Sequence, residues 1–323
     1  MRKLKILHPA PIKCLISLSL FLLTCTVGFS QKKFLEQEFQ VESDNDNYTL
    51  DVSSDRYYSS GLAIRYRVLK DPTPRKWILL KIIRSYELNH RIFTPKKLYW
   101  TEIEELDRPY AGQLSVAASN EYFYKNNTYL KVKGELGWMG PALKTGKLQY
   151  NWHKIVNTHL PRAWEYEINN GPIINAYATY AKTMAVYEHI DVTSEANLAL
   201  GTTFNHLKQE FIIRIGKFKP IQTSTQYNGV LGIENNRPAN YECYFFVSPG
   251  IAYVAYDATI EGQLIGQSSI HTEERVPWVY QTRAGIMAGW TKFDLALLYY
   301  QRTKETTEST FHKCVGIRMA RRF

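Results

Sequence analysis

Stretches of about ten residues with alternating apolar and polar side chains recur along most of the chain. From Trp278 to Trp290 the even positions form an apolar band with an aromatic residue at each end, whereas the odd positions include Gln281 and Arg283. A strand with lipid on one face and a polar lumen on the other has this pattern, with aromatic residues at both interfaces. Further segments of this kind lie at Leu62–Val68, Leu114–Phe123, Leu130–Trp138, Phe211–Phe218, Tyr244–Tyr256 and Phe293–Tyr299.

The C-terminal segment continues the pattern and ends in an aromatic residue. Val315, Ile317, Met319 and Phe323 share one phase, opposite a set that includes Arg322. After residue 30 no segment has the eighteen or so consecutive apolar residues that a spanning helix needs. The pattern therefore predicts an all-β protein, a transmembrane antiparallel β-barrel whose closure removes the open sheet edges that a membrane does not tolerate.

The N-terminus has the features of an export signal. Four basic residues precede an apolar run at Cys14–Leu23, and small residues lead to a cleavage site after Ser30. This predicts a signal peptide over residues 1–30 and one outer-membrane barrel domain over 31–323. Thr24-Cys25 resembles a lipoprotein signal weakly, because Thr is a poor residue before a lipidated Cys.

Charge and cysteine content limit the partners and the chemistry. The formal net charge is +10, of which four basic residues belong to the predicted signal peptide. A basic mature chain in this compartment suits an anionic partner such as lipid phosphate, and nucleic acid is excluded as a partner by location. Cys243 and Cys314 remain after cleavage, either as a disulfide or as two free, buried thiols. No Cys/His metal spacing is present.

One region departs from the strand pattern, between the strands that end near Met139 and begin near Ile173. Here Leu148, Trp152, Ile155 and Val156 have helical spacing, which predicts a short helix in a long loop. Gln149 and His153 are four residues apart and would share the adjacent face of that helix. Long loops with structure of their own are more often functional than structural.

Three other polar blocks could carry chemistry. Glu42–Asn47 is dense in oxygen ligands that suit Ca²⁺, although Asn and Asp also form plain hairpin turns. Asp55–Leu62 and Asp107–Gly112 each place an Asp-Arg pair before an aromatic residue and a Gly. For Asp107 and Arg108 we favour a structural role, as a lumen-facing ion pair next to a Gly at a barrel bend.

In the order and spacing of these blocks the chain resembles the outer-membrane lipid A 3′-O-deacylase family. The resemblance covers nearly the whole mature chain and rests on Glu42-Ser43-Asp44, Asp55–Leu62, Asp107–Gly112 and the stretch from Gly140-Pro141 through Gln149 and His153 to Trp164. It implies a barrel of about twelve strands with an active site between the wall and a helix from an extracellular loop. It also implies Ca²⁺-dependent hydrolysis of the 3′-linked acyl ester of lipid A.

The resemblance assigns roles by position. His153 would be the general base that activates water, and Asp44, with an oxygen of Ser43 or Asn45, would hold or orient Ca²⁺. Ser59 would line the site, and Gln149 would position the helix face or a water. Ca²⁺ would stabilise the oxyanion, and imidazole titrates near neutral pH, as a base for water must.

The chain departs from the family pattern at two positions. Ser43 stands where the family usually has Asn, so either Ser43-Asp44 or Asn45-Asp46 could be the functional pair. His159 stands where some members have an acidic residue.

Two other functions stay open from sequence. One is an outer-membrane phospholipase-type esterase, which usually needs a serine oriented by histidine, and the other is a catalytically silent barrel that acts as a pore or scaffold. The expected partners are lipopolysaccharide as substrate, outer-membrane lipid, and the barrel assembly machinery during insertion.

Overall fold

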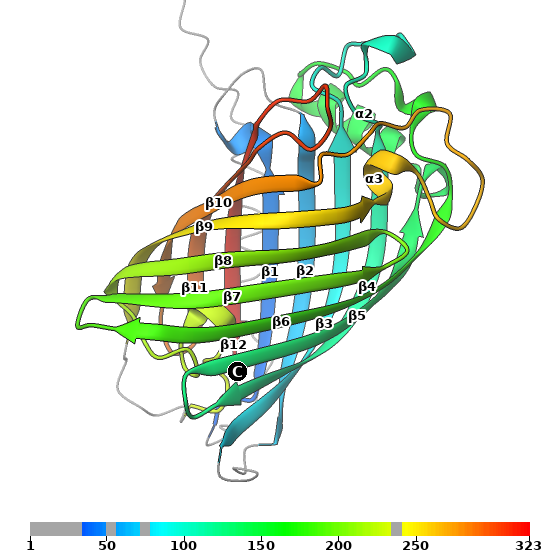
Figure 1. Ribbon diagram of the computed structural model, residues 1–323. Coiled ribbons are helices and arrows are strands. Elements are labelled where there is room, and N and C mark those ends of the chain that lie inside the picture. The colour runs from blue at the N-terminus through cyan, green and yellow to red at the C-terminus, as the bar shows by residue number, and fades with distance from the viewer. Residues whose placement is uncertain (1–33, 50–55, 72–77, 234–240) are drawn as a thin grey trace, which may run out of the picture.

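The computed structural model describes residues 34–49, 56–71, 78–233 and 241–323 (Figure 1). The predicted signal peptide and Asp55 lie outside these ranges. Among the described residues, no helix has the length and apolar character to cross a membrane.

Twelve antiparallel strands form a closed barrel, in which each strand pairs with its neighbours in the sequence and the first pairs with the last. This confirms the predicted fold class. The strands are β1 (Gln37–Asn45), β2 (Tyr57–Asp71), β3 (Leu79–Thr94), β4 (Ala111–Tyr124), β5 (Thr128–Met139), β6 (Gly171–Val186), β7 (Ile190–Gly201), β8 (Phe204–Lys217), β9 (Glu242–Asp257), β10 (Trp278–Gly289), β11 (Phe293–Arg302) and β12 (His312–Arg322). The helices are α2 (Thr145–Val156), α3 (Ala258–Glu261) and the short 3₁₀ turns η1 (Asp46–Thr49), η2 (Ile103–Glu105), η3 (Pro141–Leu143), η4 (Trp164–Tyr166) and η5 (Thr225–Tyr227).

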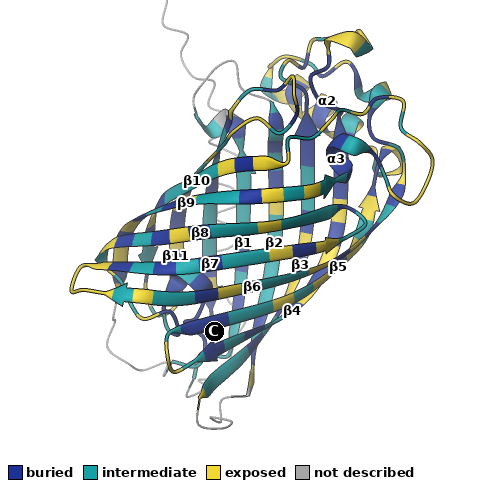
Figure 2. Cartoon of the chain, in the orientation of Figure 1, coloured by how far each residue is buried: buried dark blue, intermediate teal, exposed yellow. Residues whose placement is uncertain are grey.

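The alternation seen in the sequence separates the two faces of the wall. On β10 the side chains of Trp278, Tyr280 and Ile286 are exposed, whereas those of Val279 and Met287 are buried (Figure 2). Alternation along a strand sends successive side chains to opposite faces, so the exposed set faces lipid and the buried set faces the lumen.

Buried ion pairs join the first, second and last strands across the closure of the barrel. Arg322 on β12 contacts Glu38 on β1 at 2.6 Å, and Arg67 on β2 contacts the same carboxylate at 2.6 Å. Because burying an unpaired charge is costly, these side chains stabilise one register of the closing strands.

The two ends of the barrel differ in the length of their connections (Figure 1). Short turns mark the periplasmic end of such barrels, and longer loops mark the extracellular end. By this rule α2 and α3 are extracellular, because they lie in the β5–β6 and β9–β10 connections.

One periplasmic connection is long and folds back into the lumen. Ile221, Tyr227 and Leu231 of the β8–β9 connection are buried in a cluster that also contains side chains from the inner wall. Lys81 of β3 donates to the carbonyl oxygens of Gly229 and Leu231. We call residues 218–233 the plug, because they fill the periplasmic end of the barrel.

Asp107 and Arg108 are both buried, but they do not form the predicted lumen-facing ion pair. Asp107 accepts a hydrogen bond of 2.8 Å from the hydroxyl of Tyr57. Arg108 donates to Glu305 at 3.0 Å and to Thr259 at 2.7 Å. The ion-pair prediction was wrong because these side chains tie three extracellular loops together, a role that depends on residues far away in the sequence.

Cys243 and Cys314 are both free thiols, and only Cys314 is buried. Of the two alternatives left open by the sequence, the free thiols are therefore confirmed and the disulfide is not, but the expected burial of Cys243 was wrong, because this residue is exposed.

Candidate active site

The loop after β5 turns sharply before it forms the predicted helix. Gly140 has φ +113°, a conformation that L side chains rarely adopt, and Pro141 opens the 3₁₀ turn η3. Lys144 then takes a left-handed conformation, and α2 runs from Thr145 to Val156. Asn157, also left-handed, ends the helix by donating its backbone N–H to the carbonyl of His153. The sequence prediction of a short helix here is confirmed.

The first turn of α2 lies against the outer face of the barrel wall. A Cβ atom built on Gly112 of β4 would lie 2.4 Å from the Cβ of Thr145, so only glycine permits this approach. The Nε2 atom of His90 on β3 lies 3.4 Å from the hydroxyl oxygen of Thr145. The strand neighbours of Gly112 and His90 point into the lumen, so both of these residues belong to the outer face.

The helix turns its polar side towards the protein and leaves its apolar residues exposed. Thr145, Gln149 and His153 are buried, with His153 only 3% exposed. Leu148, Trp152 and Ile155, which predicted the helix, are all exposed. This arrangement is the reverse of an ordinary surface helix, which buries its apolar stripe.

The imidazole of His153 is oriented by two neighbours that follow α2. Its Nδ1 atom lies 2.7 Å from the carbonyl oxygen of His159 and 2.9 Å from the hydroxyl oxygen of Thr158. A carbonyl oxygen can only accept, so Nδ1 carries the proton and Nε2 is the basic nitrogen of the neutral ring. His159 therefore acts through its main chain at the position where the resemblance leads one to expect an acidic side chain.

Gln149 is held one turn before the histidine. Its side-chain oxygen accepts a hydrogen bond of 2.9 Å from the indole N–H of Trp164. The same indole packs on Gly146, where an added Cβ would lie 2.6 Å from the ring. Trp164 thus fixes both the helix and the amide of Gln149.

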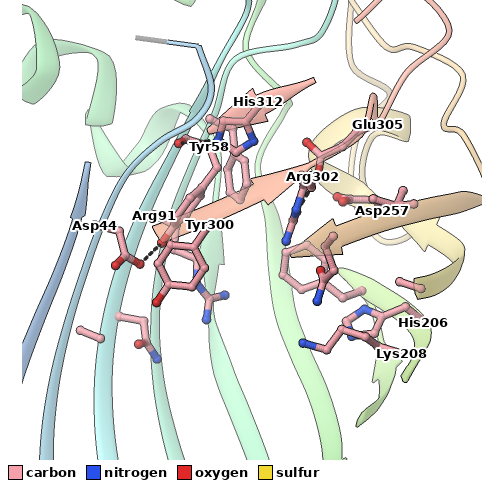
Figure 3. A pocket seen from close by; sticks show the side chains of 18 of the residues that line it. Asp44, Tyr58, Arg91, His206, Lys208, Asp257, Tyr300, Arg302, Glu305 and His312 are labelled. Atoms are coloured by element: carbon pink, nitrogen blue, oxygen red, sulfur yellow. Dashed lines mark hydrogen bonds and ion pairs between the residues drawn. The ribbon is translucent and has the colours of Figure 1, made fainter. Parts of the chain in front are cut away.

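The predicted metal residues lie at the extracellular end of β1. Asp44 points into the lumen, where its Oδ2 atom accepts a hydrogen bond of 3.0 Å from Tyr58 (Figure 3). Its Oδ1 atom is buried and has no hydrogen-bond partner among the described residues. Ser43 lies on the opposite phase, with its hydroxyl 3.3 Å from that of Tyr48.

Asn45 ends β1, and Asp46 begins η1. The register places Asn45 opposite Ser60, Ser60 opposite Ile92, and Ile92 opposite Gly112. We call Gly112, on which the first turn of α2 packs, the seat of α2. Three strand spacings, about 14 Å, therefore separate Asn45 from this seat. The helix α2 is itself about 18 Å long. Asp46 is fully buried, and its Oδ2 atom accepts the backbone N–H of Arg56 at 2.6 Å.

Ser59 is 1% exposed and lies at an irregularity of the sheet. The β2–β3 register shifts between Tyr58 and Ser60, so Ser59 is the extra residue of a β-bulge. Bulges of this kind re-aim side chains next to functional sites.

The Asp44 side of the wall opens into a polar lumen cavity of about 410 Å³. Figure 3 shows Asp44, Tyr58 and Tyr300 on one side of it and His206, Lys208 and Asp257 facing them. These side chains come from the inner phase of the strands, whereas α2 lies on the outer phase. Asp44 and the seat of α2 are therefore on opposite faces of the sheet.

Ca²⁺ would find oxygen donors but no dense acidic cluster in this region. Within the described ranges, no group of three or more His, Cys, Asp or Glu side chains could hold a metal ion. Segment 43–46 still fits a hard cation chemically, because its side chains offer oxygen donors. Such an ion would also need backbone, hydroxyl or water oxygens.

The family model described as "Outer membrane protein LpxR" matches residues 15–323. The chain belongs to the LpxR family. It is accordingly an outer-membrane protein, as the sequence predicted. A comparison with curated proteins gives no match.

Among solved structures, the chain is similar to LpxR from Salmonella typhimurium, with 17% identity and a TM-score of 0.71 over 88% of this chain and 100% of that one. It also matches the β domain of the Bordetella autotransporter BrkA, with 10% identity and a TM-score of 0.44 over 90% and 100% of the two chains. A third match is an outer membrane channel from Pseudomonas putida F1, with 10% identity and a TM-score of 0.46 over 92% and 98%. At these identities the likeness to the Salmonella LpxR structure concerns the fold.

Sequence reasoning missed several residues that build this LpxR-family site. His90 and Thr158 contact α2 or its histidine through side chains that were not singled out, and Trp164, which ends the last sequence block, was given no role of its own. Two glycines, Gly112 and Gly146, were readable signals, because each lies where the side chain of a residue from another segment comes close.

Proposed function

We propose that this protein is an outer-membrane lipid A deacylase that hydrolyses the 3′-linked acyl ester. The observation that carries the proposal is the reversed helix α2, whose first turn lies against the outer face of the wall and whose buried histidine is oriented by two neighbours. An ester of an outer-leaflet lipid reaches that face without leaving the membrane. Family membership and the resemblance of the sequence blocks support the same substrate.

In the proposed reaction, Nε2 of His153 takes a proton from a water molecule as the water oxygen attacks the ester carbonyl carbon. The tetrahedral intermediate then breaks its bond to the sugar oxygen. The imidazolium returns the proton to that oxygen, which gives a free sugar hydroxyl and a carboxylic acid. His153 lies in the last turn of α2, where the helix dipole favours a positive charge.

The other proposed roles concern positioning and charge. Gln149 would orient the water or the ester next to His153, and Ser59 would line the site at the bulge. Exposed Lys147 and Lys154 on α2 would attract the anionic groups of the lipid. Ca²⁺, held by Asn45 and Asp46 at the rim of the wall, would supply positive charge to the developing oxyanion. We choose this pair over Ser43-Asp44 because Asp44 faces the lumen.

Mass spectrometry of lipid A from cells that express wild-type protein or His153→Ala tests the proposal. The wild type should remove one acyl chain, and the variant should lose activity by a factor of about 10² to 10⁴, the usual contribution of a general base. Heat-modifiable gel mobility should show a folded barrel for both. Unchanged lipid A with the wild-type protein in the presence of Ca²⁺ would rule the proposal out. Release of fatty acid from glycerophospholipids alone would favour the phospholipase-type esterase.

The metal assignment has its own test. Asp46→Asn should raise the Ca²⁺ concentration for half-maximal hydrolysis at least tenfold, because it removes a carboxylate from the proposed ligand set. Asp44→Asn is the matched control and should leave that concentration unchanged. The reverse result would move the ion to the lumen side of β1.

A further inference from the structure

The lipid-facing wall below α2 contains an apolar groove of about 740 Å³. Its sides are formed by Ile64, Tyr86, Val116, Leu136 and Ile174, which belong to five successive strands from β2 to β6. These are side chains of the outer phase, and all except the half-buried Ile64 are exposed on the wall. The groove therefore opens to the acyl region of the bilayer rather than to the lumen.

The floor of the groove is made by small residues in register. Ala118 of β4 and Gly134 of β5 both line the groove and lie opposite each other. The same row continues beyond the lining to Ala176 of β6, which lies opposite Gly134. A Cβ atom built on Gly134 would have no other atom within 4 Å. Packing therefore does not require a glycine at position 134, because a larger side chain would fit there. Strands also favour larger side chains than glycine.

The groove lies on the same strand face as the seat of the helix. Along β4 the outer positions are Gly112, which contacts Thr145 of α2, then Leu114, Val116 and Ala118. At about 3.4 Å per residue, the groove begins at Val116, about 14 Å from Gly112, and its floor is about 20 Å away. Leu114 and Trp138 occupy the row between them, so an apolar surface connects the two.

We propose that this groove binds the acyl chain whose ester lies at α2, and that Gly134 and Ala118 set the chain length the enzyme accepts. The inference rests on the proposed hydrolase function. The occupant is a substrate acyl chain because the groove continues from the seat of the candidate catalytic helix. An ester held near the rim would direct its hydrocarbon down the wall into this space.

The experiment fills the groove with a large side chain and varies the length of the substrate acyl chain. Purified wild-type protein and Gly134→Trp are assayed in detergent micelles on two synthetic lipid A preparations, one with a long and one with a short 3′-linked chain. Gly134→Trp should lower kcat/KM for the long chain at least tenfold, since a single misplaced methylene can cost that much. It should leave kcat/KM for the short chain within twofold of the wild type.

Ala284→Trp provides the matched control. Ala284 also faces lipid, on β10, six strands away from β4 in both directions round the barrel. This variant should retain the long-chain preference of the wild type. Equal long-chain activity of the wild type and Gly134→Trp would overturn the proposal, and so would equal losses on both substrates.

A binding measurement separates failure of the groove from failure of the hydrolase function. Native mass spectrometry records how much long-chain lipid A each protein retains, whether or not it is cleaved. A wild type that cleaves neither substrate would refute the proposed function. The groove would still be supported if Gly134→Trp retained several-fold less lipid A than Ala284→Trp, and it would be refuted if the two retained the same amount.

Discussion

The histidine of α2 is oriented by one side chain and one main-chain atom. Substitution can remove the side-chain contact, but it leaves the main-chain contact in place. Thr158 contributes its hydroxyl, whereas His159 contributes a carbonyl oxygen that every residue has. The sequence could not reveal this partner, because a main-chain acceptor leaves no mark on residue identity. An acidic side chain is therefore not needed at position 159 to hold the ring.

This difference gives a prediction for a pair of variants. Thr158→Val should lower kcat about fivefold, the effect of losing one hydrogen bond of about 1 kcal/mol. His159→Ala should stay within about twofold of the wild type, because the carbonyl remains. Lipid A hydrolysis measured on purified, folded protein tests both. A large loss in His159→Ala with none in Thr158→Val would contradict the orientation described here.

Glu167 is a buried carboxyl group at the end of η4, in the same loop as α2. Its Oε2 atom has no hydrogen-bond partner in the described part of the chain. Burial raises its pKa from an ordinary value of 4.5 to about 8. The folded loop therefore binds the proton more tightly than the unfolded loop does, and the resulting stabilisation is complete below about pH 4.5.

We expect that stabilisation to be lost as the pH rises from about 4.5 to about 8. Hydrogen exchange of residues 164–170, corrected for the intrinsic pH dependence of amide exchange, should show less protection at pH 9 than at pH 5. Glu167→Gln carries no titrating proton and should show the same protection at both. Equal pH dependence in the two proteins would rule out Glu167 as the cause.

Among the elements, the strands were predictable and the orientation of the helix was not. Alternation over segments such as Leu130–Trp138 determines which side chains face lipid, and the structure follows it. The spacing of Leu148, Trp152 and Ile155 predicts a helix but does not say which side is buried. The buried side is decided by Gly112 and Trp164, which lie outside the helix.

The exposed apolar flank of α2 leads to a prediction about membrane depth. Its first turn packs on Gly112, which lies two residues, about 7 Å, along β4 from Leu114. Leu114 pairs with Trp138, and an outward-facing Trp near the end of a strand marks the membrane interface. Leu148, Trp152 and Ile155 beside exposed Lys147 match the pattern of an interfacial helix. We therefore expect Trp152 to contact the outer leaflet.

Fluorescence in vesicles of brominated phospholipid tests this contact. The protein has other tryptophans, so the quenched signal is the difference between the wild type and Trp152→Phe. That difference should be strongly quenched by lipids brominated near the headgroup end of the acyl chain and little quenched by lipids brominated at the chain terminus. A Trp152 signal that neither lipid quenches would show that the flank faces water or another part of the protein.

For the molecule as a whole, barrel closure follows from the sequence, but the filling of the lumen does not. The plug contains residues such as Gln222 and Tyr227 that suggest an ordinary loop. Gln222 nevertheless donates to the backbone carbonyl of Tyr124, and Tyr227 packs on Tyr129 at a centroid distance of 4.7 Å. These contacts join segments about a hundred residues apart, and no local pattern predicts them.

The plug determines whether the barrel is an open pore or is closed to ions. Conductance in planar bilayers measures which of the two holds. The wild-type protein in planar bilayers should give no steady channel current. Replacing residues 221–231 with a short Gly-Ser linker should produce open channels, because it removes the buried cluster at the periplasmic end. Heat-modifiable mobility should confirm that the shortened protein still forms a barrel. A large steady current through the wild type would support the pore hypothesis.

The reversed polarity of α2 has a consequence for when hydrolysis can begin. The helix holds its polar side inward only where a finished sheet supports it, and the proposed lipid contact is available only from the outer leaflet. A chain still crossing the periplasm carries His153 but has no wall for it to work against. Under the proposed function, the timing of activity is thus coupled to assembly, because only the inserted barrel offers both the finished wall and access to the outer leaflet.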